Sequence, residues 1–274
     1  MKGTLYVCAT PIGNLNDISL RLRETLDAVD LIAAEDTRHS QKLLTHLGIQ
    51  KPCISYFTHN RRGHGEVIIE ALLEGKNVAL ISDAGMPAIS DPGEELVAEC
   101  AERGIRVSPV PGPCAAISAL AISGLSTGRF VFEGFLSTQK KGRMDRLSEL
   151  ADEKRTMIFY EAPHKLLRTL EDFVTVFGAE RKISLCREMT KLYEETLRMT
   201  MAEAVSYYTA QPPKGEFVLI VEGKEEKAEN WDTVSVEEHV AIYTKEGMSK
   251  MDAVKRVAKE RGVPKRDVYD AVMK

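Results

Sequence analysis

Short apolar runs alternate with helical patterns from the start of the chain to about Val110. Each run is rich in β-prone residues, and each segment between two runs repeats its apolar residues at helical spacing. The predicted strands are 4–9, 30–34, 53–57, 77–82 and 105–110, and the predicted helices are 17–28, 39–47, 63–74 and 93–103. This alternation predicts a mostly parallel sheet that is covered by helices on both faces.

The pattern changes in the second half of the chain. Predicted strands at 130–133, 156–160, 182–187, 194–199 and 215–222 are joined by helices near 114–124, 143–151, 163–176 and 201–208. The strands 182–187 and 194–199 have no helix between them, so we expect them to pair antiparallel. The second sheet is therefore predicted to be mixed. Thr200 and Glu203 have the spacing of a capping box at the start of its last helix.

The last part of the chain is predicted to be a separate helical unit. The polar segment 222–230 has no periodicity and is typical of a linker. Ser235 and Ser249 each begin a capping-box sequence, and the helix that follows Ser249 ends at Gly262. The spacing resembles a helix-turn-helix, although a dimerisation or packing module would show the same pattern. Between Lys245 and Lys274, nine Lys and Arg residues outnumber five Asp and Glu residues.

The predicted fold class is thus α/β with three parts. We expect an N-terminal α/β domain over 1–113, a second α/β domain over 114–224 and the helical unit over 232–274.

Three loops that follow predicted strands are built from small residues, Gly and Pro. They are residues 10–15, 82–93 and 111–116, and the second carries the carboxylate of Asp83 near its start. Open α/β sheets bind ligands at the carboxyl ends of their strands, and small side chains let a ligand approach the backbone. Each loop alone could be an ordinary strand-to-helix turn, but the three together predict a binding site at one sheet edge.

Carboxylates also stand at the ends of two further predicted strands. Glu35 and Asp36 follow one predicted strand, and Glu161 follows another. One of them could orient or deprotonate a substrate hydroxyl while Arg38 holds a phosphate. A salt-bridged loop or a helix cap is the alternative.

Composition narrows the class of protein. The net charge of the 274 residues is −4, so contact with nucleic acid would have to come from local basic clusters such as 59–64 and 139–146, which could also be plain solvated surface. The five cysteines show no C-x-x-C spacing, and this indicates neither a disulfide framework nor a zinc site. The sequence also lacks the dinucleotide-binding, P-loop, zincin and G-x-S-x-G motifs. A metal-free cytoplasmic protein is expected.

Five motifs occur in an order that resembles the tetrapyrrole-methylase-like (class III) methyltransferases. They are Thr10–Leu15, Ala34–Arg38, Ile81–Gly93, Pro111–Pro113 and Phe159–His164. The resemblance implies two α/β domains with S-adenosylmethionine in the cleft between them, a homodimer and no metal. Within the family, the chain is most similar to the enzymes that methylate the 2′-oxygen of a cytidine ribose in bacterial small-subunit (16S) ribosomal RNA.

The resemblance also implies site residues. The cofactor contacts expected from it are Pro11, Ser82, Asp83, Gly85, Met86, Pro111, Gly112, Cys114, Ala115 and Glu161. The porphyrin-modifying relatives have Gly-Gly-Asp-Pro in place of Ile81–Ala84 and Thr in place of Cys114, which makes the contacts there the least certain part of the comparison.

Methylation of a ribose hydroxyl needs a proton acceptor and contacts to the RNA backbone. The candidate acceptors are Glu35, Asp36 and Glu161, with no choice among them. The candidate RNA contacts are Arg38, Arg61, Arg62, Lys140, Lys141 and Arg143. Two other functions stay open: methylation of a tetrapyrrole or corrin precursor, and a nucleic-acid-binding regulator without catalytic activity.

Overall fold

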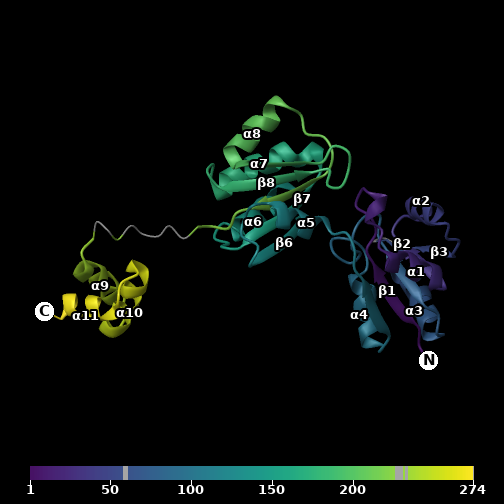
Figure 1. The fold of residues 1–274 in the computed structure, drawn as a ribbon, viewed down its shortest axis with the longest axis horizontal. Coiled ribbons are helices and arrows are strands. Elements are labelled where there is room, and N and C mark those ends of the chain that lie inside the picture. Colours follow the sequence, from purple (N-terminus) through teal and green to yellow (C-terminus); the bar gives the residue numbers. More distant parts are fainter. Residues whose placement is uncertain (58–60, 226–230, 232–233, 274) are drawn as a thin grey trace. The chain divides into compact units, whose positions relative to one another are not determined.

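The computed structural model describes the chain except for residues 58–60, 226–230, 232–233 and 274. It contains two compact units, Met1–Lys224 and Glu225–Lys274 (Figure 1). The larger unit holds two five-stranded sheets, formed by strands before and after residue 113. The boundaries 1–113, 114–224 and 232–274 stay predictions. Among the helices of the described residues, none has both the length and the apolar character needed to cross a membrane.

The first sheet is parallel throughout, with strand order β3-β2-β4-β1-β5. Its strands are β1 (Thr4–Cys8), β2 (Leu31–Ala34), β3 (Cys53–Ser55), β4 (Val78–Ile81) and β5 (Arg106–Val110). Because β4, β1 and β5 are neighbours and run in the same direction, the loops that follow them leave the same edge of the sheet. The topology therefore brings together the three loops rich in Gly and Pro.

Helices cover both faces of this sheet, as predicted. They are η1 (Leu15–Asp17), α1 (Leu20–Ala28), α2 (Thr37–Leu47), α3 (Arg61–Leu73) and α4 (Glu94–Glu102). One apolar cluster joins Leu26 of α1 and Leu44 of α2 to the sheet, and another joins Leu72 of α3 and Leu96 of α4 to it. The predicted helix 17–28 is divided between η1 and α1. Ser19 is the N-cap of α1, and its hydroxyl accepts a hydrogen bond from the Leu22 amide.

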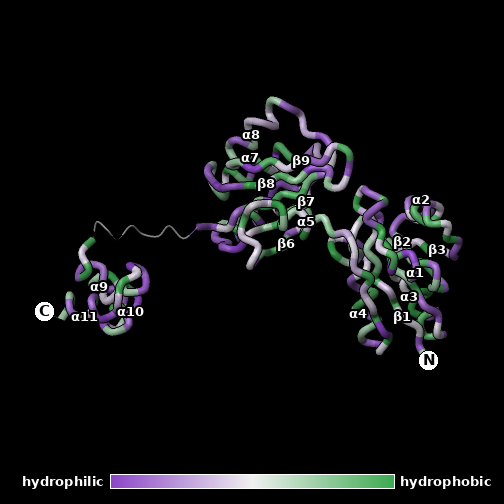
Figure 2. The backbone as a smooth tube through the Cα atoms, viewed as in Figure 1, coloured by the Kyte–Doolittle hydropathy of each residue, from purple (hydrophilic) through white to green (hydrophobic). Residues whose placement is uncertain are grey.

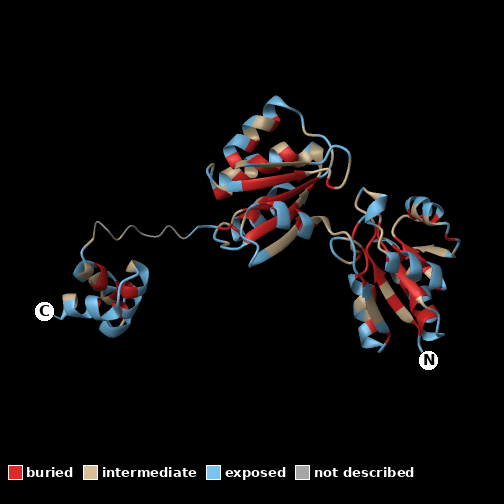
Figure 3. Cartoon of the chain, viewed as in Figure 1, coloured by how far each residue is buried: buried red, intermediate tan, exposed pale blue. Residues whose placement is uncertain are grey.

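The second sheet is mixed, as predicted, with strand order β6-β7-β10-β8-β9. Its strands are β6 (Phe130–Phe135), β7 (Thr156–Glu161), β8 (Lys182–Arg187), β9 (Glu195–Thr200) and β10 (Phe217–Val221). Only β6 and β7 pair in parallel, and β8 pairs antiparallel with β9. A bulge in β6 lies between Phe132 and Gly134, where Gly134 takes a φ of 61°. The buried strands of both sheets are red in Figure 3.

The helices of the second sheet are α5 (Ala115–Ile122), α6 (Lys140–Glu149), α7 (Pro163–Phe177) and α8 (Met201–Ala210). Helices α6, α7 and α8 bury one face of the sheet through Leu147, Phe173 and Met201, whereas α5 covers the other face. The Thr200–Glu203 capping box is present at the start of α8. Helix α6 begins three residues before its predicted start at 143, and this changes the environment of Arg143.

The smaller unit contains α9 (Val236–Lys245), α10 (Lys250–Arg261) and α11 (Lys265–Val272), which share an apolar cluster of their own. Hydrophobic and hydrophilic residues alternate along these helices (Figure 2). Ser235 forms the predicted capping box, whereas at Ser249 only the hydroxyl is used: it accepts from the Asp252 amide and donates to the Asp252 carboxylate. Trp231 stacks on the buried His239 with ring centroids 3.4 Å apart.

Candidate active site

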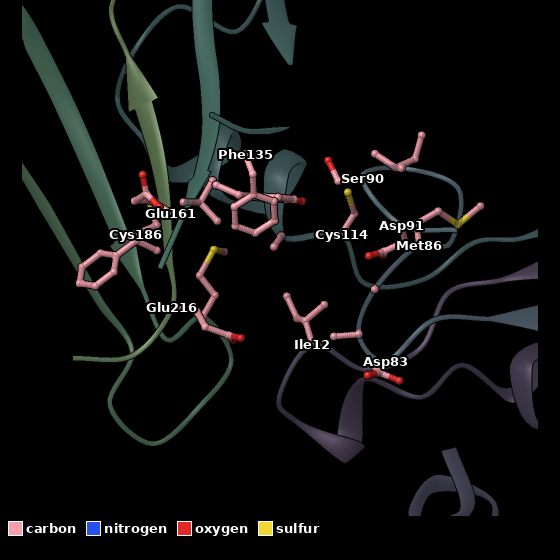
Figure 4. A pocket seen from close by; sticks show the side chains of 18 of the residues that line it. Ile12, Asp83, Met86, Ser90, Asp91, Cys114, Phe135, Glu161, Cys186 and Glu216 are labelled. Atoms are coloured by element: carbon pink, nitrogen blue, oxygen red, sulfur yellow. The ribbon is translucent and has the colours of Figure 1, made fainter. Parts of the chain in front are cut away.

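A cavity of about 360 Å³ is lined by residues of both sheets in the larger unit (Figure 4). This volume is in the range of small-molecule sites, roughly 300–1,000 Å³. The loops after β1, β2, β4 and β5 contribute Ile12, Glu35, Asp83, Ala84, Gly85, Met86, Ile89, Ser90, Asp91, Cys114 and Ala115. Residues in and next to the strands of the second sheet contribute Phe135, Tyr160, Glu161, Ala162, Cys186, Glu188, Met189, Lys191, Glu216, Phe217 and Val218.

Backbone hydrogen bonds hold the loops of the first sheet together. The Thr10 amide donates to the Gly85 carbonyl at 2.9 Å, and the Gly85 amide donates back to Thr10 at 3.1 Å. Gly85 has a φ of 80°, and a Cβ at that position would lie 3.3 Å from Cγ2 of Ile12. Gly is therefore needed here both for its conformation and for the close approach of the two loops.

Six of the ten predicted cofactor contacts line the cavity: Asp83, Gly85, Met86, Cys114, Ala115 and Glu161. The other four, Pro11, Ser82, Pro111 and Gly112, do not. Ser82 is buried and receives the Thr10 hydroxyl on its carbonyl, and a Cβ on Gly112 would lie 3.1 Å from the Ala9 side chain. Ser82 and Gly112 thus pack the loops against one another.

Three carboxylates lie close together on the first-sheet side of the cavity. Asp83 accepts a hydrogen bond from the Asp36 amide at 3.2 Å, so it ties the end of β4 to the end of β2. Burial raises the pKa of Glu35. Burial, with the negative charges of Glu35 and Asp83, raises the pKa of Asp91 to about 6 despite a hydrogen bond from Ser82. Asp91 is thus a half-buried carboxylate that titrates near neutrality.

The predicted proton acceptors have different surroundings. Glu161 is buried, and its two carboxylate oxygens accept from the Ala162 amide at 2.8 Å and the Thr169 hydroxyl at 2.6 Å. Asp36 does not line the cavity; it caps α2, and its hydrogen bonds from Arg38 lower its pKa. Glu35 lines the cavity. One Glu35 oxygen accepts a hydrogen bond from the Asp83 amide at 3.5 Å, so Glu35 is held less tightly than Glu161.

The opposite wall is partly aromatic and partly charged. Tyr160 packs against Phe132 and Phe135, and burial raises the pKa of its hydroxyl to about 12. Lys191 lies 2.9 Å from a Glu188 oxygen and 2.8 Å from a Glu216 oxygen. The positive charge on this wall is therefore already paired.

The predicted RNA contacts divide into exposed and buried side chains. Lys140 and Lys141 are exposed at the start of α6, and Arg38 is exposed beside Asp36. Arg143 is buried instead: its guanidinium lies 2.6 Å from Asp172 and donates to the Ser137 carbonyl. A buried, paired Arg143 is not available to RNA, which corrects the prediction. Arg61 and Arg62 begin α3, and their side chains lie outside the described residues.

The cavity suits a small organic ligand that carries a positive charge. Ala84, Gly85 and Ala115 present backbone and very small side chains, Met86 and Ile12 present apolar surface, and the three carboxylates supply negative charge. In the part of the chain that the structure describes, no group of three or more His, Cys, Asp or Glu side chains is placed to hold a metal ion.

Comparison with known proteins defines the class. The model of the tetrapyrrole (corrin/porphyrin) methylases matches residues 4–205, and the chain belongs to this family. Solved structures share the fold: uroporphyrin-III-C-methyltransferase from Thermus thermophilus has a TM-score of 0.58 at 18% identity, covering 81% of this chain and 94% of that one. Diphthine synthase has a TM-score of 0.62 at 12% identity, covering 81% and 90%.

Curated relatives of high identity share one name. Ribosomal RNA small subunit methyltransferase I of Halalkalibacterium halodurans is 51% identical, over 98% of this chain and 94% of its own. The proteins of that name from Bacillus subtilis and Escherichia coli O157:H7 are each 45% identical, over the same shares of the two chains. The family and the fold class expected from the sequence motifs are thereby confirmed.

Several cavity residues were not predicted. Asp91 belongs to the small-residue loop, but nothing in its sequence distinguishes it from the neighbouring polar residues. Phe135, Cys186, Glu188 and Glu216 come from strands or turns of the second sheet, whose order the sequence does not reveal. The signal that the sequence offers is a position just after the carboxyl end of a predicted strand, and it applies to Phe135 and Glu188.

Proposed function

We propose that the protein transfers a methyl group from S-adenosylmethionine to the 2′-oxygen of a cytidine ribose in small-subunit ribosomal RNA. The observation that carries the proposal is the identity of 45–51% over nearly the whole chain to three proteins named for methylating that RNA. The cavity supports it, because its small-residue loops and carboxylates fit a cationic methyl donor.

The donor would lie against the loops of the first sheet. When bound, S-adenosylmethionine supplies an electrophilic methyl group on a positively charged sulfur. We propose that Asp83, Gly85, Met86, Cys114 and Ala115 contact it and that Ser82, Pro11, Pro111 and Gly112 hold those residues in place. The chain's task is then to keep the acceptor oxygen roughly 3–3.5 Å from the methyl carbon and in line with the bond that breaks.

The reaction releases the hydroxyl proton, and we propose Asp91 as its acceptor. The ribose oxygen forms a bond to the methyl carbon, the carbon–sulfur bond breaks, and the proton passes to a carboxylate. Asp91 lines the cavity and has a pKa near 6, whereas both oxygens of Glu161 are already hydrogen-bonded. A base with a pKa near the working pH is the most effective one.

The RNA backbone would be held by exposed basic side chains. Lys140, Lys141 and Arg38 are the described candidates, and Arg61 and Arg62 complete the set by sequence. Binding through such contacts weakens steeply with salt. We also propose that the protein works in the cytoplasm as a homodimer; the exposed Leu192 and Tyr193, between β8 and β9, are apolar surface that a second copy would cover.

The test uses small ribosomal subunits from cells that lack this chain, incubated with the protein and methyl-labelled S-adenosylmethionine. Label on the ribose of one cytidine is the expected result. Label on a base, label on an added tetrapyrrole alone, or no label would refute the proposal. Sedimentation of the purified protein, without ribosomal subunits, tests whether it forms a dimer.

A further inference from the structure

Phe135 is a large aromatic side chain that the fold leaves in solvent at the cavity. It ends β6, lines the cavity and is 60% exposed, and Figure 4 shows its ring projecting into the space between the two walls. A ring so placed has not been buried by folding, although burying a Phe side chain is worth about 1.5–3 kcal/mol. Because it also lines a cavity, the exposed ring is available for contact with a bound ligand.

The ring is held in place from behind. Tyr160 packs against Phe135 with centroids 5.4 Å apart, and it meets Phe132 edge-on at 5.3 Å. Tyr160 in turn packs against the apolar cluster that contains Ala116. Phe135 is thus a preorganised surface, because partly buried side chains of β6 and β7 support it.

A second exposed apolar side chain lies on the opposite loop. Ile89 lines the cavity and is 48% exposed, and its neighbours Ala88 and Ser90 have φ values of 66° and 60°. Such left-handed conformations cost non-glycine residues of the order of 1 kcal/mol each and are found at ligand sites. A Cβ on Gly134 would lie 2.7 Å from Ser90 Oγ, so this loop abuts the residue that precedes Phe135.

We infer that Phe135 is the platform on which the base of the acceptor nucleotide stacks, with Ile89 bounding the same slot from the other loop. This inference rests on the proposed function. Delivery of a ribose oxygen into the cavity brings the attached base with it, and that base must leave its own stack to enter. Enzymes that act on a single nucleotide compensate that loss by stacking the extruded base on aromatic or apolar side chains.

The donor is the other flat ligand that the ring could meet. The small-residue loops around Gly85 and Ala115 are its proposed site, which leaves the exposed ring to the acceptor. Measuring the donor affinity and the kinetics of RNA methylation therefore shows which of the two ligands contacts the ring.

The experiment compares full-length wild type with Phe135→Ala, Phe135→Leu and Phe135→Tyr. Phe130→Ala is the matched control, because Phe130 begins the same strand, is 39% exposed and does not line the cavity. Methylation of small ribosomal subunits gives kcat and KM, calorimetry gives the dissociation constant of S-adenosylmethionine, and thermal melting checks folding.

Phe135→Ala and Phe135→Leu should each lose about 5- to 150-fold in kcat/KM for the subunit, because base–aromatic stacking contributes about 1–3 kcal/mol. Phe135→Tyr should retain most activity, Phe130→Ala should match wild type, and all should bind the donor as wild type does. Full activity in Phe135→Leu would show that bulk, not a stacking face, is needed, and would overturn the inference.

Two other outcomes also overturn it. A loss of donor affinity equal to the loss of kcat/KM in Phe135→Ala would assign the ring to the donor, and unchanged kinetics in that variant would leave the ring without a role. A wild-type chain that labels no RNA would instead refute the proposed function itself, and the inference with it.

Discussion

Asp91 is a residue whose burial lowers stability and, by the role proposed for it, prepares it to accept a proton. Its pKa of about 6 lies above the ordinary value of 3.8, so between these pH values the folded chain binds more protons at this site than the unfolded chain does. The free energy of unfolding therefore falls as pH rises through this range. Above about pH 6 the charged carboxylate opposes folding, as expected for a group kept ready to accept a proton.

Asp91→Asn is therefore expected to melt at a higher temperature than wild type above about pH 7, and the gain should disappear near pH 4. Its kcat should fall by about 100-fold or more, because the proton acceptor is lost. Wild-type activity should decline as pH falls below about 6. Asp27→Asn, on the exposed side of α1, is the control and should change neither property. A variant with normal kcat would remove Asp91 from the reaction.

Asp83 is expected to contribute to donor binding in two ways, since it lines the cavity and accepts from the Asp36 amide. Asp83→Ala should abolish binding of S-adenosylmethionine in calorimetry. Asp83→Asn keeps the acceptor for the amide but not the charge, so it should bind measurably and more weakly than wild type. Wild-type affinity in Asp83→Ala would exclude this residue from the donor site.

Among the elements, α6 and the β6 bulge show where sequence patterns stop being informative. The strands were predicted to within two residues, because short apolar runs between polar turns mark them. The start of α6 was not, since Lys140–Gly142 carry no apolar residue. The error matters for Arg143, which the extra turn places against Asp172 rather than in solvent.

We expect the exposed start of α6 to contribute to RNA binding from the second sheet. Lys140→Ala with Lys141→Ala should leave donor affinity unchanged, weaken binding to small-subunit RNA and reduce the slope of log affinity against log salt by about 1 to 2. Lys76→Ala is the control. Lys76 precedes β4, at the end of the first sheet opposite the cavity loops, and it pairs with Glu74. An unchanged salt slope in the double variant would place the RNA elsewhere.

At the scale of the whole molecule, the fold class was accessible from the sequence and much of the site was not. Alternating strands and helices specify a parallel sheet, and small-residue loops specify its ligand edge. The second wall of the cavity depends on strand order and burial, which are tertiary properties. Asp91 and Phe135 became candidates only when their exposure was known.

The two compact units also predict separable functions. Among the described residues, those that line the cavity all precede Lys224, and the smaller unit has its own apolar cluster. A chain ending at Lys224 should therefore bind S-adenosylmethionine within about 2-fold of wild type, which corresponds to less than about 0.5 kcal/mol. Calorimetry on the shortened chain checks this, and a loss of donor binding would show that the last fifty residues are needed for the cavity.

The stack of Trp231 on His239 gives the smaller unit a spectroscopic label of its own. Trp231 is the single tryptophan in the sequence, so indole emission after selective excitation originates from this unit alone. Far-ultraviolet circular dichroism, in contrast, is dominated by the larger unit, which contains most of the helices and all of the strands in the described residues. Following both signals in one denaturant titration would show, without engineered dyes, whether the two units unfold in separate transitions.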